Sequence, residues 1–188
     1  MTVNPDKLAK QVEETVKNPG HPPLDQWKPE LSGDMDLRIS RDGQWIFKGE
    51  PMAREAIVRL FSTILRREAD GHYYLVTPVE KWRIQVEDTP LLAHSLEASG
   101  EGEQQVLSLT TSVGETLEIG PDHTLEIGTY ENSDEPRPVV MVRHGVEARL
   151  VTAAYYDLAE HAIERVEHEH SVFGVWSHGI FYKIGQGG

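Results

Sequence analysis

The densest group of ionisable side chains lies in the last third of the chain, where acidic residues alternate with histidines. Its members are Glu160, His161, Glu164, Glu167, His168, Glu169 and His170. Glu167 and His170 have the E-x-x-H spacing of di-iron helices, but such a site needs two of these pairs and two further glutamates on a four-helix bundle. The sequence predicts no bundle. We therefore interpret the group as a solvated helix face with a frayed end, and we predict no metal site.

Four cations occupy matching positions in two segments of the chain. Lys48 and Arg143 each end a predicted strand, and Arg54 and Arg149 each fall in the first turn of a predicted helix. A cation there opposes the helix dipole, so a compensating anion is expected. This anion is either a nearby carboxylate or a ligand held by the arginines and the helix N–H groups. Structural ion pairs are the commoner case. The nearest carboxylates in the sequence are Glu50, Glu55, Glu80 and Glu147.

The segment from Pro78 to Trp82 stands where the two predicted parts of the chain join. Pockets between domains are a favoured ligand location. Here Glu80 could accept a hydrogen bond from a sugar or a base, and Lys81 could pair with a phosphate. The alternative is that Trp82 braces the two parts, and the residues do not decide between these interpretations. The other aromatic residues lie on alternating strands and are predicted to be core.

Hydrophobic periodicity predicts an α+β protein in two parts, residues 1–80 and residues 81–188. The first part contains an amphipathic leading helix, a hairpin around Asp42-Gly43, a helix and an aromatic strand. The second part is predicted to be mainly antiparallel β structure. A helix over about residues 146–166 caps it, and a final hairpin closes it.

An internal duplication relates the two parts. When Ala53-Arg54 is laid on Ala148-Arg149, the segment Trp45–Lys48 falls on Val140–Arg143. Each helix is then followed by a glycine and an aromatic strand. Strand–helix–strand units are common in proteins, but the shared Ala-Arg at the helix start favours a real repeat. We therefore expect a repeated strand–helix–strand motif.

The composition excludes several classes of protein. The 188 residues contain no cysteine, which rules out disulfides, iron–sulfur clusters and cysteine nucleophiles. The net charge of -13 opposes binding to duplex nucleic acid and to anionic membranes. No signal peptide or membrane-spanning run is visible, so we predict a cytoplasmic protein. The phosphate-cradling, dinucleotide and nucleophile-elbow motifs are missing, so binding is a better prediction than catalysis.

An ordered set of short segments resembles a known family. The segments are Pro22–Pro29, Gly33–Ile39, Asp42–Trp45, Leu60–Arg66, Gly71–Lys81, Val86–Pro90 and Arg143–Arg149. Together they are similar to the bacterial domain-of-unknown-function 1285 family. The resemblance implies a two-part α+β fold with repeated motifs, whose C-terminal part is superficially like a pleckstrin-homology domain. It also implies a nucleotide-like ligand at the interface of the two parts and a role in signal transduction. It supplies no catalytic residue and no cofactor.

We therefore predict a non-enzymatic module that binds a small, anionic, nucleotide-like ligand. The predicted ligand-binding residues are Lys48, Arg54, Glu80, Lys81, Trp82, Arg143 and Arg149. The main alternative is a protein-interaction adaptor without a small ligand, and the least favoured is a hydrolase that acts on a nucleotide. We expect no cofactor, no duplex nucleic acid and no membrane as partner.

Overall fold

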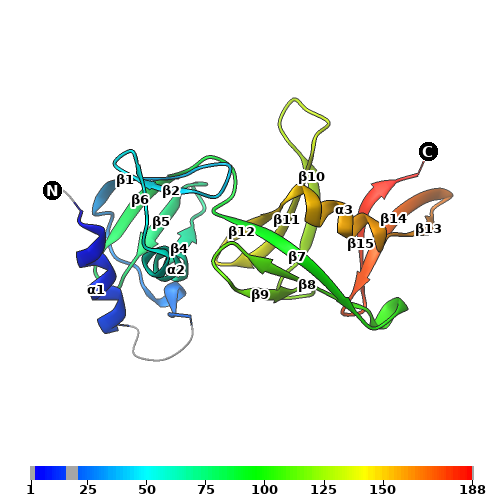
Figure 1. Ribbon diagram of the computed structural model, residues 1–188, viewed down its shortest axis with the longest axis horizontal. Coiled ribbons are helices and arrows are strands. Elements are labelled where there is room, and N and C mark those ends of the chain that lie inside the picture. Colours follow the sequence, from blue (N-terminus) through cyan, green and yellow to red (C-terminus); the bar gives the residue numbers. More distant parts are fainter. Residues whose placement is uncertain (1–2, 16–20, 188) are drawn as a thin grey trace. The chain divides into compact units, whose positions relative to one another are not determined.

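The computed structural model describes residues 3–15 and 21–187, and the chain divides into two compact units (Figure 1). The first unit is Met1–Pro90 together with Arg143–Val146, and the second is Leu91–Val142 with Glu147–Gly188. The described residues form three α-helices and are otherwise mostly strands, which is the mixed architecture that the sequence predicts. None of these helices is long and apolar enough to cross a membrane.

A six-stranded sheet forms the centre of the first unit. Its strand order is β3-β2-β1-β6-β5-β4. The strands are β1 Gly33–Ile39, β2 Trp45–Phe47, β3 Glu50–Pro51, β4 Leu65–Arg67, β5 Tyr73–Val76 and β6 Lys81–Val86. β1 and β6 pair in parallel, whereas the other neighbours are antiparallel. The expected boundary after residue 80 falls between β5 and β6, and β6 lies in this first sheet.

The sequence of β1 shows why the strand forms. Met35, Leu37 and Ile39 are buried, whereas Asp34 and Asp36 between them are exposed. This alternation matches the two-residue period of a strand. The predicted hairpin to β2 is present, and Gly43 takes the positive φ of 82° that its turn requires.

Helices accompany the first sheet. They are α1 Pro5–Thr15, the short 3-10 helix η1 Leu24–Gln26, and α2 Glu55–Thr63. α1 buries Leu8, Ala9 and Val12, which share one helical face, and it contacts α2. The predicted end of the leading helix at Asn18-Pro19-Gly20 lies outside the described residues.

The second unit contains a second six-stranded sheet and a smaller three-stranded one. The larger has the order β10-β11-β12-β7-β8-β9, and the smaller has the order β13-β14-β15. Its elements are β7 Leu91–Ser99, η2 Gly102–Gln104, β8 Val106–Thr111, β9 Thr116–Glu118, β10 Leu125–Thr129, β11 Pro136–Arg143, β12 Val146–Leu150, α3 Thr152–Glu160, β13 Ile163–Glu167, β14 His170–Ser177 and β15 Ile180–Gln186.

The two large sheets repeat one topology. Read from its other end, the second order is β9-β8-β7-β12-β11-β10, so β7 to β12 occupy the same places as β1 to β6 in the first sheet. In both, the first and sixth strands lie side by side in parallel, with Ile39 opposite Val86 in one and Ala148 opposite Leu91 in the other. The expected duplication is therefore present at the level of two similar sheets.

The details of the predicted repeat are wrong. Arg54 directly precedes α2, whereas Arg149 lies inside strand β12, so the two arginines are not equivalent. The helix expected over residues 146–166 is α3 alone, with β12 before it and β13 after it. Val146, Ala148 and Leu150 are buried, and the residues between them are less so, which is the two-residue period of a strand. The packing of these side chains outweighs the preference of the segment for a helix.

A buried serine joins the three-stranded sheet to the second large sheet. The Ser177 hydroxyl donates to the carbonyl of Ile119 at 2.5 Å and accepts from the N–H of Leu107 at 3.0 Å. Ser177 is fully buried, so water cannot replace either bond. Next to it, the His178 backbone N–H donates to the carbonyl of Gln105 at 3.1 Å.

We expect Ser177→Ala to lower the free energy of unfolding by about 1–3 kcal/mol, because it leaves a buried N–H and a buried carbonyl unpaired. Denaturant unfolding followed by circular dichroism measures the change. Ser99→Ala, at an exposed position of β7, is the control and should change the free energy little. Equal effects of the two substitutions would contradict this role of Ser177.

Candidate functional site

Two of the predicted cations lie on the surface of the first unit. Lys48 occupies the turn between β2 and β3, with its Nζ 5.4 Å from the centre of the Phe47 ring. Arg54 stands at the start of α2, and its Nη1 lies 2.7 Å from the Asp6 carboxylate of α1. The anion beside Arg54 is thus a carboxylate, although not one of the four that the sequence suggested.

Arg143 begins the turn between β11 and β12 and belongs to the first unit. Its Nη2 donates to the carbonyl of Ser62 at 3.5 Å. The next residue, His144, places Nδ1 3.2 Å from the Asp25 carboxylate and accepts the Arg67 N–H at its carbonyl. These contacts tie the turn to β4 and to the η1 region.

Lys81 belongs to a charged network on one face of the first sheet. Its Nζ lies 3.0 Å from the Glu68 carboxylate and 4.7 Å from the centre of the Tyr74 ring. Arg66 donates to the other Glu68 oxygen at 2.6 Å. The Arg66 Nη1 also donates to the carbonyls of Leu24 and Trp27, at 2.8 and 2.9 Å. The network therefore fastens the proline-rich segment to the sheet.

The same network perturbs two acid–base equilibria. Burial raises the pKa of Glu68, but hydrogen bonds from Lys81 and Arg66 outweigh it, so the pKa lies below its usual 4.5. The Tyr74 hydroxyl donates to Asp70 at 2.5 Å, and this bond raises the pKa of Tyr74 to about 12. Lys81 thus neutralises a protein carboxylate, which gives it a structural role.

Glu80 and Trp82 line a cavity of about 270 Å³ beside α1, which we call the indole cavity. Its lining residues are Val3, Asn4, Lys7, Leu8, Gln11, Glu80 and Trp82. The Trp82 side chain is only 6% exposed. Its Nε1 is buried and meets no hydrogen-bond acceptor among the residues that the structure describes.

Two opposite charges line the indole cavity without pairing. Within the described chain, neither the Lys7 ammonium nor the Glu80 carboxylate forms an ion pair or hydrogen bond. Glu80 is held in place by its backbone, because its N–H donates to the Thr77 Oγ1 at 2.9 Å and its carbonyl accepts the Thr77 N–H at 2.9 Å. This turn fixes Glu80 directly before β6.

Arg149 lines a different cavity, of about 250 Å³ in the second unit, which we call the tyrosine cavity. Its lining residues are Tyr130, Glu135, Pro136, Pro138, Arg149, Leu150, Thr152, Tyr155 and Tyr156. The Tyr155 and Tyr156 rings lie 6.4 Å apart, and Tyr156 is 66% exposed. A planar ring and an anion are the groups that such a lining suits.

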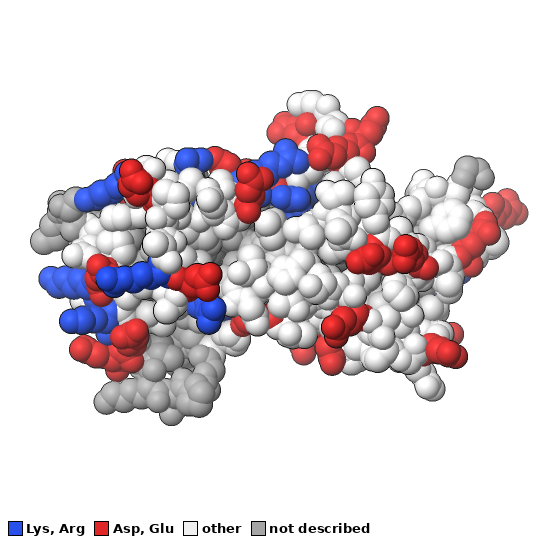
Figure 2. Space-filling model, in the orientation of Figure 1, with Lys and Arg blue, Asp and Glu red and all other residues white. Residues whose placement is uncertain are grey.

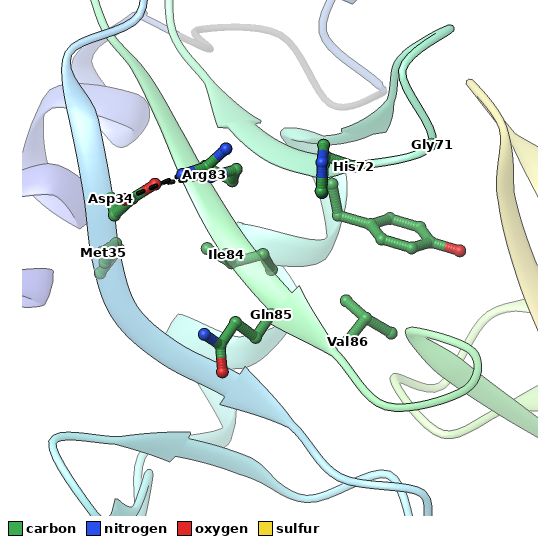
Figure 3. Close-up of a pocket in the computed structure, with 9 residues that line it drawn as sticks. Asp34, Met35, Gly71, His72, Arg83, Ile84, Gln85 and Val86 are labelled. Carbon is green, nitrogen blue, oxygen red and sulfur yellow. Dashed lines mark hydrogen bonds and ion pairs between the residues drawn. The ribbon is translucent and has the colours of Figure 1, made fainter.

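A third cavity, of about 470 Å³, contains none of the predicted site residues (Figure 3). Asp34 and Arg83 turn toward each other there and pair through two hydrogen bonds, at 2.6 and 3.0 Å. The hydrogen bond from Arg83 lowers the pKa of Asp34. His72 lies beside this pair, next to Gly71. The two charges of this pair therefore neutralise each other.

The acidic and histidine group of the last third does not lie on one helix. Glu160 ends α3, Glu164 and Glu167 lie in β13, and His168 and Glu169 form the turn to β14. Glu167 pairs with Lys183 at 2.6 Å, and that hydrogen bond lowers the pKa of Glu167. No group of three or more potential ligands that could hold a metal occurs within residues 3–15 and 21–187.

The structure therefore separates the seven predicted residues. Glu80 and Trp82 share a cavity, Arg149 lines another, and the remaining four lie in ion pairs or turns. Lys7 is not among the predicted residues, although the leading helix is predicted to be amphipathic. Lys7 and Gln11 are four residues apart, beside the apolar positions that bury Leu8 and Val12, but this spacing does not show what the helix packs against.

Family models match nearly the whole chain. The N-terminal domain of DUF1285, a domain of unknown function, matches residues 22–89, and the C-terminal domain of DUF1285 matches residues 90–184. A crystal structure of a DUF1285 family protein from Silicibacter pomeroyi DSS-3 is 38% identical and superposes with a TM-score of 0.86, covering 99% of this chain and 97% of that chain.

A second solved relative, a DUF1285 family protein from Shewanella baltica OS155, is 27% identical with a TM-score of 0.53. That match covers 67% of this chain and 91% of the other. A search of curated proteins finds no match. The chain belongs to the DUF1285 family, whose function is uncharacterised.

We expect Glu68→Gln to lower the free energy of unfolding at pH 7 by about 1–3 kcal/mol, because the charge-assisted hydrogen bonds from Arg66 and Lys81 to the carboxylate are lost. The folded pKa of Glu68 lies below its usual 4.5. Its stabilisation is therefore complete above about pH 4.5 and is lost as the pH falls through the folded pKa.

Denaturant unfolding of both proteins from pH 7 down to pH 3 tests this, with the exposed Glu97→Gln as control. The difference between wild type and Glu68→Gln should shrink at acid pH. A difference that stays constant over the whole range would show that the Glu68 charge contributes nothing.

Proposed function

We propose that this protein is a non-enzymatic binder of a small ligand, and that the ligand occupies the indole cavity. The observation that carries the proposal is the buried Nε1 of Trp82, which has no acceptor in the described chain. A buried donor without a partner costs about 1–3 kcal/mol, and native proteins leave few of them. An oxygen atom of a ligand would remove this cost.

The distribution of charge supports the first unit as the place for an anionic group. Residues 1–90 contain 13 Lys and Arg against 15 Asp and Glu, whereas residues 91–188 contain 5 against 16. On the face drawn in Figure 2, most Lys and Arg side chains lie over the first unit. An anion near Arg149 would meet the repulsive field of the second unit, whereas Lys7 stands in a nearly neutral one.

The size of the indole cavity bears on the predicted nucleotide. The volume of 270 Å³ lies just below the range of roughly 300–1,000 Å³ for pockets that enclose a drug-sized ligand, so a whole nucleotide would fit only with part of it outside. The nucleotide-like ligand, the signalling role and the likeness to a pleckstrin-homology domain stay predictions from the family resemblance.

The protein-interaction adaptor is a second candidate, favoured by the surface of the three-stranded sheet. Val166 and Ile163 on β13 are 71% and 47% exposed, and Phe173 and Ile180 are also exposed. These exposed apolar side chains are distributed over the three strands of one sheet, and exposed apolar groups favour contact with another protein. This surface is separate from the indole cavity, so both functions could reside in one chain.

We expect Trp82→Phe to abolish ligand stabilisation while leaving the ligand-free protein nearly as stable as wild type. Phenylalanine removes the unsatisfied N–H, which stabilises the protein, but it is smaller than the buried indole, which destabilises the protein. These two effects on stability oppose each other. Thermal unfolding is measured with a panel of nucleotides, carboxylates and amino acids. A ligand at 100 times its Kd stabilises the protein by about 2.7 kcal/mol.

Trp176→Phe, in the second unit, is the matched control and should keep the full thermal shift. The proposal fails when no compound raises the Tm of the wild-type protein. It also fails when Trp82→Phe retains the same shift as the control.

A further inference from the structure

We infer that the ligand of the indole cavity is a small zwitterion, an α-amino acid with an apolar side chain. The inference rests on the proposed function of that cavity. Three observations carry it: a buried indole N–H without an acceptor, an unpaired cation and an unpaired anion, on three residues that line the same cavity. A zwitterion is the ligand class that satisfies all three groups at once.

The donors of the cavity suit a carboxylate. Lys7 contributes an ammonium from α1, and the Trp82 indole, whose N–H is buried, lines the cavity from β6. A carboxylate has two oxygen atoms and about four lone-pair sites, so it accepts from both donors. Its charge makes each bond stronger than a bond to a neutral carbonyl. The Trp82 N–H then gains the acceptor that the described residues do not supply.

The acceptor of the cavity suits an ammonium group. The backbone of Glu80 is fixed by the turn with Thr77, directly before β6, and its side chain lines the cavity. Lys7 and Glu80 line the same cavity yet do not pair with each other. A ligand with only a negative charge would leave the Glu80 carboxylate unsatisfied and repelled. A ligand that also carries an ammonium satisfies it.

The remaining lining sets the size and polarity of the ligand. Val3 and Leu8 present apolar groups, and Gln11 adds an uncharged amide. The volume of 270 Å³ lies just below the range of roughly 300–1,000 Å³ for pockets that enclose a drug-sized ligand, which favours a small ligand. Leucine is a small amino acid whose apolar side chain suits the two apolar walls.

The test compares L-leucine with isocaproate, which lacks the ammonium, and with isoamylamine, which lacks the carboxylate. Each probe is titrated into the full chain by calorimetry. Nitrogen-edited NMR follows the indole N–H signal of Trp82, assigned with Trp82→Phe. We expect leucine to bind at least about tenfold more tightly than either probe, and to move the indole signal toward a hydrogen-bonded position. Tenfold is the loss expected for one strong polar contact.

Charge-neutralising variants separate the two ends of the ligand. Glu80→Gln should weaken leucine about tenfold but should not weaken isocaproate, because it removes a charge that repels that anion. Lys7→Gln should weaken leucine but should not weaken isoamylamine, because it removes a charge that repels that cation. Lys10→Gln and Glu13→Gln, at exposed positions of α1 outside the cavity lining, change the net charge equally and should bind leucine like wild type.

Isocaproate binding as tightly as leucine would overturn the zwitterion and leave the proposed small-ligand function standing. The zwitterion is also overturned when none of these probes binds but another compound of the thermal panel stabilises the wild-type protein and not Trp82→Phe. The proposed small-ligand function stands in that case too. When no compound of either set binds, both the inference and the proposed function fall.

Discussion

The parallel pairing of β1 with β6 is the contact on which the first unit depends. β1 is the last strand of one half of the sheet, with β2 and β3, and β6 is the last strand of the other half, with β4 and β5. The two halves become one sheet only when β1 and β6 pair. The register places Gly33 opposite Trp82. Gly33 has a φ of 148°, and a Cβ there would stand 3.2 Å from the Trp82 ring. Glycine therefore makes room for the indole that lines the cavity.

The second constraint is the Glu68 carboxylate between Arg66 and Lys81. Ion pairs on exposed surfaces contribute little, but the Arg66 and Lys81 side chains are only 14% and 18% exposed, and Glu68 accepts from both. The Arg66 guanidinium also donates hydrogen bonds to the carbonyls of Leu24 and Trp27. The segment around the short η1 is thus fastened to β4, which explains why a proline-rich stretch takes a defined path.

Much of the local structure follows from the sequence. The alternation in β1, the turn at Asp42-Gly43 and the amphipathic α1 are local signals, and the structure confirms them. β13 was missed because Ile163–Val166 are all exposed, so no alternation of buried residues marks the strand. The parallel pairs were also unpredictable, because they join strands distant in sequence. For the site, Glu80 and Trp82 were singled out as neighbours of a predicted junction and line one cavity inside the first unit, whereas Lys7 required knowledge of where α1 docks.

The separation of Lys81 from Trp82 has a simple geometric cause. Successive residues of a strand point to opposite faces of the sheet. Lys81 and Trp82, which were predicted to bind one ligand, therefore lie on opposite faces. Lys81 contacts Tyr74 and Glu68, whereas Trp82 lies with residues of α1. The family model begins at residue 22. Trp82 and Glu80 therefore come from the shared domain, and Lys7 comes from the helix that precedes it. The cavity is lined by residues of that helix and of the sheet, so the docking of α1 determines that Lys7 shares the cavity with Glu80.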